Sequence, residues 1–181
     1  MRDPWKPSVT VAAVVERDGR FLLVEEQTAD GVRLNQPAGH LDPGESLLAA
    51  AARETLEETA FAFTPRHLVG VYLWRAASPP AGAEVTYLRF AFCGALGALD
   101  PGRPLDDGIL RTLWLTPAEI AARAAEHRSP LVQRCVDDYL AGARYSLDLL
   151  FAHPSAVAPV EAEAQASSAT NWAPPSAGAT R

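Results

Sequence analysis

The order of the expected elements predicts an α/β fold in which a mixed β-sheet is sandwiched between helices, an α/β/α arrangement. Three observations support this prediction. Apolar, β-branched runs open the chain, a helix with a dense acidic end lies near its middle, and two helices with clear start signals follow the last apolar strand. With 181 residues, of which 48% are hydrophobic and 21% charged, the chain is long enough for one well-packed domain.

We expect this domain to span residues 5–151. Residues 152–181 are dominated by Ala, Pro and Ser, and bulky apolar residues are sparse there. Such a segment cannot bury enough apolar surface to offset the entropy of ordering its backbone, about 1–2 kcal/mol per residue. It is therefore predicted to be a disordered tail that is dispensable for chemistry. Just before it, apolar residues recur at spacings suited to packing against the domain, namely Tyr145, Leu147, Leu149 and Leu150.

Two apolar runs indicate the first strands. Residues 9–15 and 21–26 flank a turn at 17–20 that contains a glycine, and together they predict a β-hairpin. Because both runs are continuously apolar, burial on both faces is expected. The polar residues 27–32 are then expected to form a loop.

A second hairpin is expected after the central helix. Residues 62–74 and 85–92 have strand patterns, and a break rich in Pro and Gly separates them. Residues 94–108 are expected to form a loop, and 109–115 a final strand.

Two helices follow this strand in the prediction. The first has the start signals of a capping box with a proline at its first position, given by Thr116, Pro117 and Glu119. The second starts at Ser129 and Pro130. Its apolar stripe consists of Leu131, Val132, Cys135, Val136, Tyr139 and Leu140.

The segment Gly39–Phe61 contains a glycine turn followed by a helix with an acidic end. Glu54, Glu57 and Glu58 have the spacing i, i+3, i+4, which places them on one face of a helix. Three such charges repel one another unless a cation lies among them, and carboxylate oxygens suit Mg²⁺ or Mn²⁺. A solvated acidic helix end is the ordinary alternative. The opposite side has a narrow stripe that we expect to face the core, made by Ala49, Ala52 and Leu56.

The same segment resembles the Nudix box, GX5EX7REUXEEXGU, in which U is a bulky apolar residue. The matching positions are Gly39, Glu45, Arg53, Glu54, Glu57, Glu58 and Phe61. Two positions depart from the pattern, because Thr55 replaces the first bulky apolar residue and Ala60 replaces the glycine. Ala60 is a mild change only if its backbone is not left-handed. The resemblance extends over residues 6–150, where segments outside the box are similar to a bacterial phosphatase of this family.

The resemblance implies a Nudix fold and hydrolysis of phosphoanhydride bonds in small diphosphates and triphosphates. Nucleoside di- and triphosphates are the main expected substrates, and thiamine-related pyrimidine pyrophosphates are a further class. Mg²⁺, or Mn²⁺ in its place, would be bound by Glu54, Glu57 and Glu58 with the Gly39 carbonyl. Arg53 and Glu45 would hold these carboxylates in orientation.

Glu54 is the preferred candidate for the general base in this chemistry. Some Nudix enzymes take the base from a loop outside the box, so Asp106 and Asp107 are alternatives. A simple loop turn is the ordinary interpretation of these two aspartates.

Further residues are candidates for substrate contact. Glu25 and Glu26 alternate on a strand, so only one can point inward, and Glu26 is preferred. His40 follows the metal-facing glycine and could contact phosphate, although an exposed loop histidine is the more common case. Arg89 interrupts an apolar strand and either binds phosphate or lies on the surface. Trp5 and Tyr87 are candidate stacking partners for a base, and equally candidate core residues.

Composition restricts the partners. A net charge of −6 argues against broad nucleic-acid binding and against an RNA-end pyrophosphohydrolase, and favours small phosphorylated substrates. A non-catalytic nucleotide-binding regulator is a rival, but it would not need the complete Arg and Glu set. Both a monomer and a homodimer are compatible with the sequence.

The expected location is the cytoplasm. Cys93 and Cys135 lack CxxC spacing and are expected to be free, buried thiols. The chain starts without an apolar signal region, and no run of about 18 apolar residues occurs.

Overall fold

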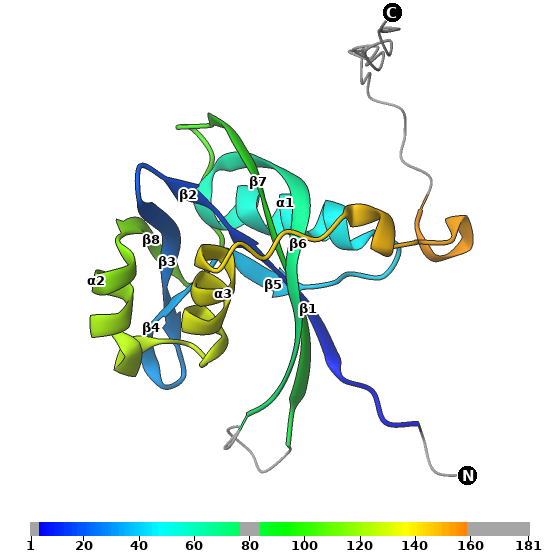
Figure 1. Ribbon diagram of the computed structural model, residues 1–181, viewed down its shortest axis with the longest axis horizontal. Coiled ribbons are helices and arrows are strands. Elements are labelled where there is room, and N and C mark those ends of the chain that lie inside the picture. Colours follow the sequence, from blue (N-terminus) through cyan, green and yellow to red (C-terminus); the bar gives the residue numbers. More distant parts are fainter. Residues whose placement is uncertain (1–3, 77–83, 159–181) are drawn as a thin grey trace, which may run out of the picture.

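The computed structural model describes residues 4–76 and 84–158 (Figure 1). The strands are β1 (Ser8–Val14), β2 (Glu16–Arg17), β3 (Arg20–Thr28), β4 (Gly31–Asn35), β5 (Ala38–His40), β6 (Phe61–Arg75), β7 (Thr86–Leu99) and β8 (Ile109–Leu115). The helices are α1 (Leu47–Thr59), α2 (Pro117–Ala122) and α3 (Leu131–Leu140). Three short 3-10 turns are η1 (Ala124–Glu126), η2 (Leu147–Leu149) and η3 (Pro154–Ala156).

The strands form two four-stranded sheets. One has the order β5-β1-β7-β6 and is mixed, because β1 runs parallel to β7 and antiparallel to β5. The other has the order β2-β3-β4, with β8 also paired to β3. The predicted α/β class with a mixed sheet between helices is therefore confirmed, and the division of the strands between two sheets is new information.

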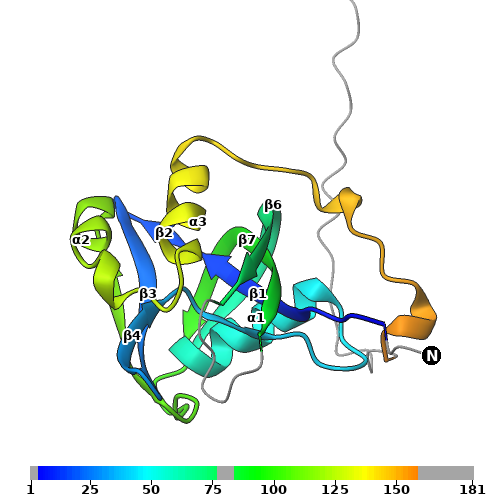
Figure 2. The same cartoon turned by 90° about the horizontal axis from the view of Figure 1, so that it is seen from below.

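The continuous apolar sequence of β1 follows from its position between two hydrophobic clusters. Val11 and Ala13 face a cluster that contains Ala50 and Ala51 of α1. Ala12 and Val14 face a second cluster, which includes side chains of α2 and α3. Figure 2 shows α1 and α3 on opposite sides of β1 and β7. Since successive side chains of a strand point to opposite faces, both faces must be apolar here, as predicted.

The predicted hairpin between residues 9–15 and 21–26 is wrong over most of its length. Only Glu16 and Arg17 pair with the start of β3, around the turn Asp18–Gly19, where both residues have positive φ. β1 then pairs with β5 and β7, whereas β3 pairs with β4 and β8. The apolar pattern indicates that a strand is buried but carries no information about which strand lies beside it.

Other strand boundaries also differ from the prediction. The expected loop at 94–108 starts later, because β7 continues to Leu99 and pairs with β6. Gly94 allows this close pairing, since a Cβ atom there would lie 2.0 Å from the Thr64 carbonyl oxygen. The loop expected at 27–32 is a short turn between β3 and β4. The second hairpin is confirmed as β6 and β7, and the final strand as β8.

The helix α2 starts as predicted, whereas α3 starts at Leu131, one residue later than predicted, with Pro130 as its N-cap. Thr116 Oγ1 accepts from the Glu119 backbone N–H, and Glu119 Oε2 accepts from the Thr116 backbone N–H, which completes the capping box of α2. At the start of α3, Ser129 Oγ accepts from the Leu131 N–H. The predicted stripe of α3 extends one residue too far, because Leu140 is 55% exposed. Cys93 and Cys135 are free and buried, as expected.

The segment after α3 runs back along the domain. Leu68 and Tyr145 exchange two backbone hydrogen bonds, of 3.0 and 2.9 Å. Leu147 and Leu150 pack onto the cluster that contains α1. Further on, the Ala158 N–H donates to the Gly44 carbonyl at 2.6 Å. The domain limits 5–151 stay a prediction, and most of the expected tail, residues 159–181, lies outside the described residues.

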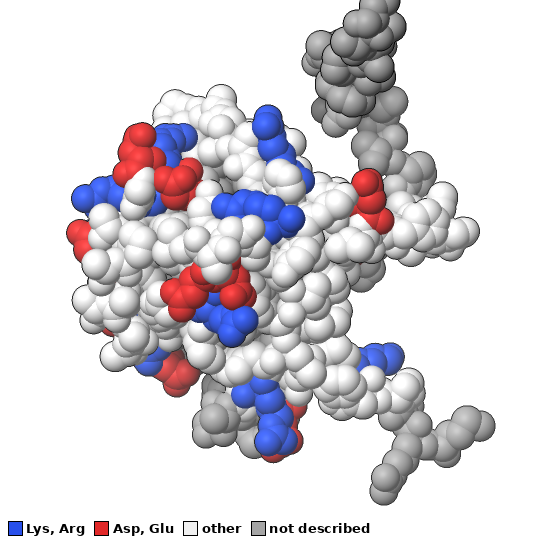
Figure 3. All heavy atoms as spheres, viewed as in Figure 1, with Lys and Arg blue, Asp and Glu red and all other residues white. Residues whose placement is uncertain are grey.

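No helix within residues 4–76 and 84–158 is both long and apolar enough to cross a membrane. On the face seen in Figure 3, acidic and basic side chains lie in mixed groups, with uncharged surface between them.

Candidate active site

The helix α1 carries the acidic residues, and both of its ends are well defined. Ser46 caps the start, where its Oγ accepts from the Ala49 N–H at 3.1 Å. The C-cap Ala60 is left-handed, with φ 58° and ψ 11°. Alanine in this conformation costs about 1 kcal/mol relative to glycine. Ala60 would be a mild departure from the Nudix box only with a backbone that is not left-handed, so the replacement of glycine here is not mild.

The face of α1 that meets the core is not the predicted one. The expected stripe was Ala49, Ala52 and Leu56, but Ala49 is exposed and the other two are only half-buried. The apolar side chains Ala50 and Ala51 are buried instead, together with Thr55. Thr55 is accommodated because its Oγ1 donates to the Ala51 carbonyl at 2.7 Å. The prediction was wrong because it placed Glu54 and Glu58 on the outer side, whereas both are buried.

Arg53 joins the acidic residues into one network. Its Nε and Nη2 donate to the two carboxylate oxygens of Glu45, at 3.1 and 2.7 Å. Its Nη1 donates to Glu54 Oε1 at 2.9 Å and to Glu57 Oε2 at 3.0 Å. Nη2 also donates to the His40 carbonyl at 3.0 Å. The bidentate contact with Glu45 fixes the plane of the guanidinium, so Arg53 holds Glu54 and Glu57 in defined orientations.

Glu54 and Glu58 face β5. Glu58 Oε2 accepts from the Ala38 N–H at 2.9 Å. A Cβ atom on Gly39 would lie 2.1 Å from the Glu54 carboxyl group, so only glycine leaves room for it there. Burial raises the pKa of Glu54, and it raises the pKa of Glu58 to about 8. In both cases neighbouring carboxylates add to the effect of burial on the pKa.

The loop that follows β7 is attached to the C-terminal end of α1. The Asp106 N–H donates to the Glu57 carbonyl at 3.0 Å, and the Asp100 N–H donates to the Ala60 carbonyl at 2.8 Å. Asp106 and Asp107, the two loop candidates for the base, are both exposed. The negative charge of Asp106 contributes to the raised pKa values of Glu54 and Glu58. Of the two loop aspartates, Asp106 is therefore the one whose charge is felt by the buried glutamates.

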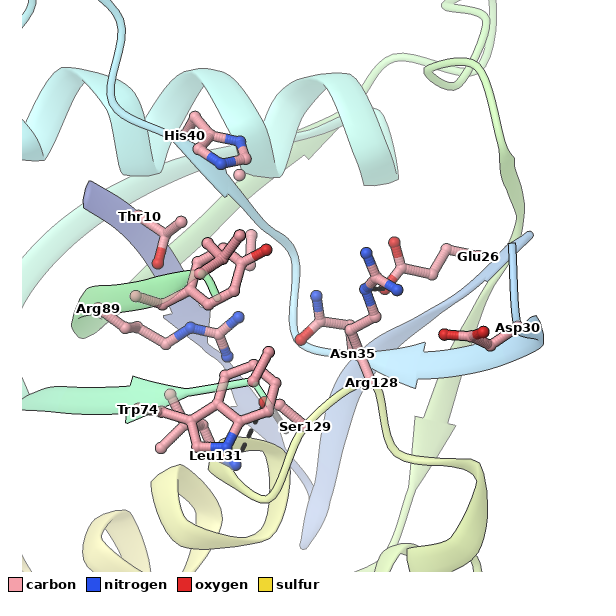
Figure 4. Close-up of a pocket in the computed structure, with 15 residues that line it drawn as sticks. Thr10, Glu26, Asp30, Asn35, His40, Trp74, Arg89, Arg128, Ser129 and Leu131 are labelled. Carbon is pink, nitrogen blue, oxygen red and sulfur yellow. Dashed lines mark hydrogen bonds and ion pairs between the residues drawn. The ribbon is translucent and has the colours of Figure 1, made fainter. Parts of the chain in front are cut away.

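A cavity of about 410 Å³ opens beside Gly39 and His40 (Figure 4). Aromatic side chains form part of its lining. The Trp74 and Tyr87 rings stack with their centroids 5.5 Å apart and an interplanar angle of 18°, and the His40 ring is tilted against Tyr87 at 6.4 Å. The polar side chains of the lining include Thr10, Glu26, Asn35, Arg89 and Arg128.

This cavity brings together four sequence candidates for substrate contact, Glu26, His40, Tyr87 and Arg89. Arg89 is buried and not a surface arginine, and His40 is exposed at the rim on β5. Glu25 lies on the opposite side of β3 from Glu26, as strand alternation requires. Its carboxylate oxygens accept from Arg111 Nε at 2.5 Å and from Arg123 Nη2 at 2.7 Å.

Comparison with known proteins decides the family. The NUDIX domain profile matches residues 4–135. The chain belongs to the Nudix hydrolase family. This Nudix hydrolase is 40% identical over 146 residues to phosphatase NudJ of Escherichia coli strain K12, covering 81% of this chain and 92% of that protein. The identity and coverage are the same for phosphatase NudJ of Shigella sonnei strain Ss046.

Solved structures agree with this assignment. A Nudix hydrolase from Nitrosomonas europaea is 52% identical and superposes with a TM-score of 0.78, over 82% of this chain and 99% of that one. The MutT protein of Methanosarcina mazei Go1 is 20% identical with a TM-score of 0.58, over 77% of this chain and 98% of that one, which shows a shared fold. The protein is thus a Nudix hydrolase, an enzyme that acts on phosphoanhydrides.

Nudix hydrolases generally use divalent metal ions, and the donors on α1 suit such an ion. Within the described residues, no three acidic, histidine or cysteine side chains already converge on one point. Arg53 Nη1 instead bridges Glu54 and Glu57. The available donors are all oxygens, and Glu54 and Glu58 are buried where a cation would favour their ionised forms. These residues therefore fit a hard divalent cation.

Sequence reasoning missed several residues of this Nudix cavity. Trp74, Asn35 and Arg128 line it, from β6, from the end of β4 and from the segment before α3. Trp74 was assigned only to a strand, and the other two were not considered. The only indication of a site in the sequence was Asn35, a polar residue at the end of a strand. The three positions are far apart in the sequence, so no local pattern connects them.

Proposed function

We propose that this Nudix hydrolase cleaves a phosphoanhydride bond in small nucleoside diphosphates and triphosphates, with Mg²⁺ as the preferred ion and Mn²⁺ as a substitute. Thiamine-related pyrimidine pyrophosphates belong to the same proposal as a second substrate class. The observation that supports it most directly is the contact of Gly39 with the buried Glu54 carboxyl group, beside Glu58. The similarity to proteins named phosphatase NudJ supports the same reaction.

In this proposal, each residue of the box has a separate task. Glu54, Glu57 and Glu58, with the Gly39 carbonyl, would hold the ion. When bound, the ion neutralises negative charge that develops on the phosphoryl oxygens. Arg53 keeps the carboxylates in place, and Glu45 holds Arg53 through two hydrogen bonds.

The general base would be Glu54. Burial already raises its pKa toward the range in which a carboxylate accepts a proton efficiently. It would take a proton from the attacking water as the oxygen of that water bonds to phosphorus and the bridging P–O bond breaks. Asp106, whose backbone is anchored to Glu57, is the alternative base.

The substrate would lie with its phosphates near α1 and the rest of the molecule in the cavity of about 410 Å³. That volume suits a small molecule and not a folded nucleic acid. The net charge of −6 and the mixed charges on the face seen in Figure 3 also support a small substrate over an RNA end. The buried free thiols of Cys93 and Cys135 suit the reducing cytoplasm, where we place the enzyme.

A phosphate-release screen tests the proposal. The full chain is incubated with nucleoside di- and triphosphates and with pyrimidine pyrophosphates, each with Mg²⁺, with Mn²⁺ and with EDTA. Release of phosphate or pyrophosphate that depends on the metal is expected. A non-catalytic nucleotide-binding regulator would instead show a nucleotide-induced rise in melting temperature with no product, and this result would refute the proposal.

A further inference from the structure

Arg89 is a buried cation, and two of its three donor nitrogens lack hydrogen-bond partners. The residue is 8% exposed, and within the described residues its Nε and Nη1 atoms have no hydrogen-bond partner. Buried polar groups are almost always hydrogen-bonded, and an unpaired charged donor is especially unfavourable. Arg89 lines the cavity, so a ligand there could complete its hydrogen bonds. The position therefore calls for hydrogen-bond acceptors on the ligand.

Acceptors without partners lie on the same cavity. They are Glu26 Oε1, Asn35 Oδ1 and Thr10 Oγ1, counted among the described residues. Glu26 Oε1 lies 3.5 Å from Arg128 Nε, an ion pair that is too long for a good hydrogen bond. Figure 4 shows the Arg89 guanidinium pointing toward Asn35, with Glu26 beyond it. The cavity thus presents a pair of donors and, next to them, acceptors.

This combination distinguishes between two kinds of ligand group. A phosphate could bind Arg89, but it has no donors for Asn35 and would face the negative charge of Glu26. A planar heterocycle that carries both carbonyl acceptors and N–H donors matches both sets of protein atoms. The stacked rings of Trp74 and Tyr87, 5.5 Å apart, give such a ring an aromatic neighbour. The contacts favour a base over a phosphate in this part of the cavity.

We infer that the cavity binds the base of nucleotide substrates and that, among nucleotides, it selects guanine. Guanine O6 and N7 would accept from the two terminal nitrogens of Arg89, Nη1 and Nη2, a pair of parallel donors with which arginine can bind this base. Guanine N1–H and its 2-amino group would donate to Asn35 Oδ1 and Glu26 Oε1. Adenine has an amino group where guanine has O6. An N–H donor would then face the donors of Arg89, and no hydrogen bond could form between them. Uracil and cytosine have no counterpart of the O6 and N7 pair.

The inference adds the identity of the base to the proposed function. It rests on that proposal for the position of the phosphates near Gly39. Binding of the base can nevertheless be measured without hydrolysis. Isothermal titration of the full chain with GMP, AMP, CMP and UMP, in EDTA, isolates the cavity from the metal site. We expect GMP to bind at least about tenfold more tightly than AMP, because a good bidentate pair discriminates by this order.

Arg89→Met removes the donors and keeps an apolar side chain of similar length. GMP should then bind about tenfold more weakly, and AMP about as before. Because a buried unpaired charge is removed, the variant is expected to melt at the same temperature as the wild type or higher. Arg66→Met, at an exposed position of β6, is the matched control and should leave both affinities unchanged. Should Arg89→Met fail to fold, Arg89→Lys decides, since it keeps the charge but lacks the planar fork and should lose the preference.

Equal affinities for GMP and AMP, or a preference for GMP that survives in the Arg89 variants, would overturn the inference. Metal-dependent phosphate release by the same preparation keeps the two proposals apart. If the protein hydrolyses nucleotides but binds the four monophosphates with equal affinity, the proposed function stands and guanine selection is rejected. Binding of GMP that depends on Arg89, without hydrolysis of any nucleotide, would support the inference and reject the proposed function.

Discussion

Gly39 of β5 lies directly against Glu54 of α1, and a Cβ atom at position 39 would be 2.1 Å from Glu54 Oε1. No side chain therefore stands between the backbone of the strand and this buried carboxylate. Arg53 Nη1 donates to the same oxygen at 2.9 Å. A strand, a helix and an arginine thus fix one oxygen, and small changes at any of them should displace it.

Gly39→Ala is expected to reduce metal-dependent turnover by about tenfold or more, because the new methyl group pushes the Glu54 carboxylate out of place. The backbone of Gly39 is not left-handed and the carboxylate is the end of a flexible side chain, so the fold should remain. Turnover and thermal unfolding are measured side by side. Gly102→Ala is the control, since its nearest neighbour would be Asp100 Oδ1 at 3.6 Å in an exposed loop. Full turnover in Gly39→Ala would show that the Glu54 position is not required.

Glu57→Gln should lower turnover by about a hundredfold or more under saturating Mg²⁺, with the fold intact. The change removes a ligand charge but keeps the size of the side chain. Steady-state kinetics over a range of Mg²⁺ concentrations, with circular dichroism of the same samples, provide the measurement. Glu16→Gln, at an exposed position of β2, is the control. Near wild-type turnover in Glu57→Gln would mean that the metal is held elsewhere.

Glu58 should make the metal-free protein less stable as the pH rises. Its pKa is about 8 in the folded state, against the ordinary 4.5, because it is buried. Below pH 4.5 the group is protonated in both states and has no effect. Between 4.5 and 8 the unfolded chain ionises first, so the free energy of unfolding falls, and above about 8 the loss is complete. Denaturant unfolding in EDTA at several pH values measures this loss.

Glu58→Gln cannot ionise and should remove most of this pH dependence. In EDTA we expect the variant to exceed the wild type by on the order of 5 kcal/mol at pH 8.5 and to equal it at pH 4.5. Mg²⁺ should raise the wild-type melting temperature at pH 8 more than that of the variant, since it binds the ionised site of the folded state. Parallel pH profiles for the two proteins would contradict the assignment of the shift to Glu58.

Truncation should separate the packed C-terminal segment from the tail. A chain ending after Gly142 lacks the Tyr145 pairing with Leu68 and the packing of Leu147 and Leu150, so we expect it to lose at least about 2 kcal/mol of stability. A chain ending after Ala158 retains these contacts and the hydrogen bond to Gly44, and should match the full chain in melting temperature and turnover. A chain ending after His153 isolates the contribution of that hydrogen bond. Loss of turnover in the chain ending after Ala158 would show that the tail acts in catalysis.

Local patterns were sufficient to identify the elements and the family. The glutamates and Arg53 are close in sequence, and a helix has a fixed period, so their mutual arrangement follows from spacing alone. The same holds for the capping box of α2, in which Thr116 and Glu119 are three residues apart. The apolar run of β1 indicated burial on both faces because every alternate side chain must meet one of two layers.

The tertiary structure decided which elements meet. β1 and β3 carry similar apolar runs, yet they lie in different sheets, because pairing depends on the packing of the whole chain and not on either strand. It also decided that Glu54 and Glu58 face inward, since the inner side of a helix is defined by what packs on it. Arg89, Asn35 and Trp74 come from separate strands and meet only when both sheets are assembled. Contacts between residues this far apart in the sequence leave no local period, so the cavity is a property of the folded chain.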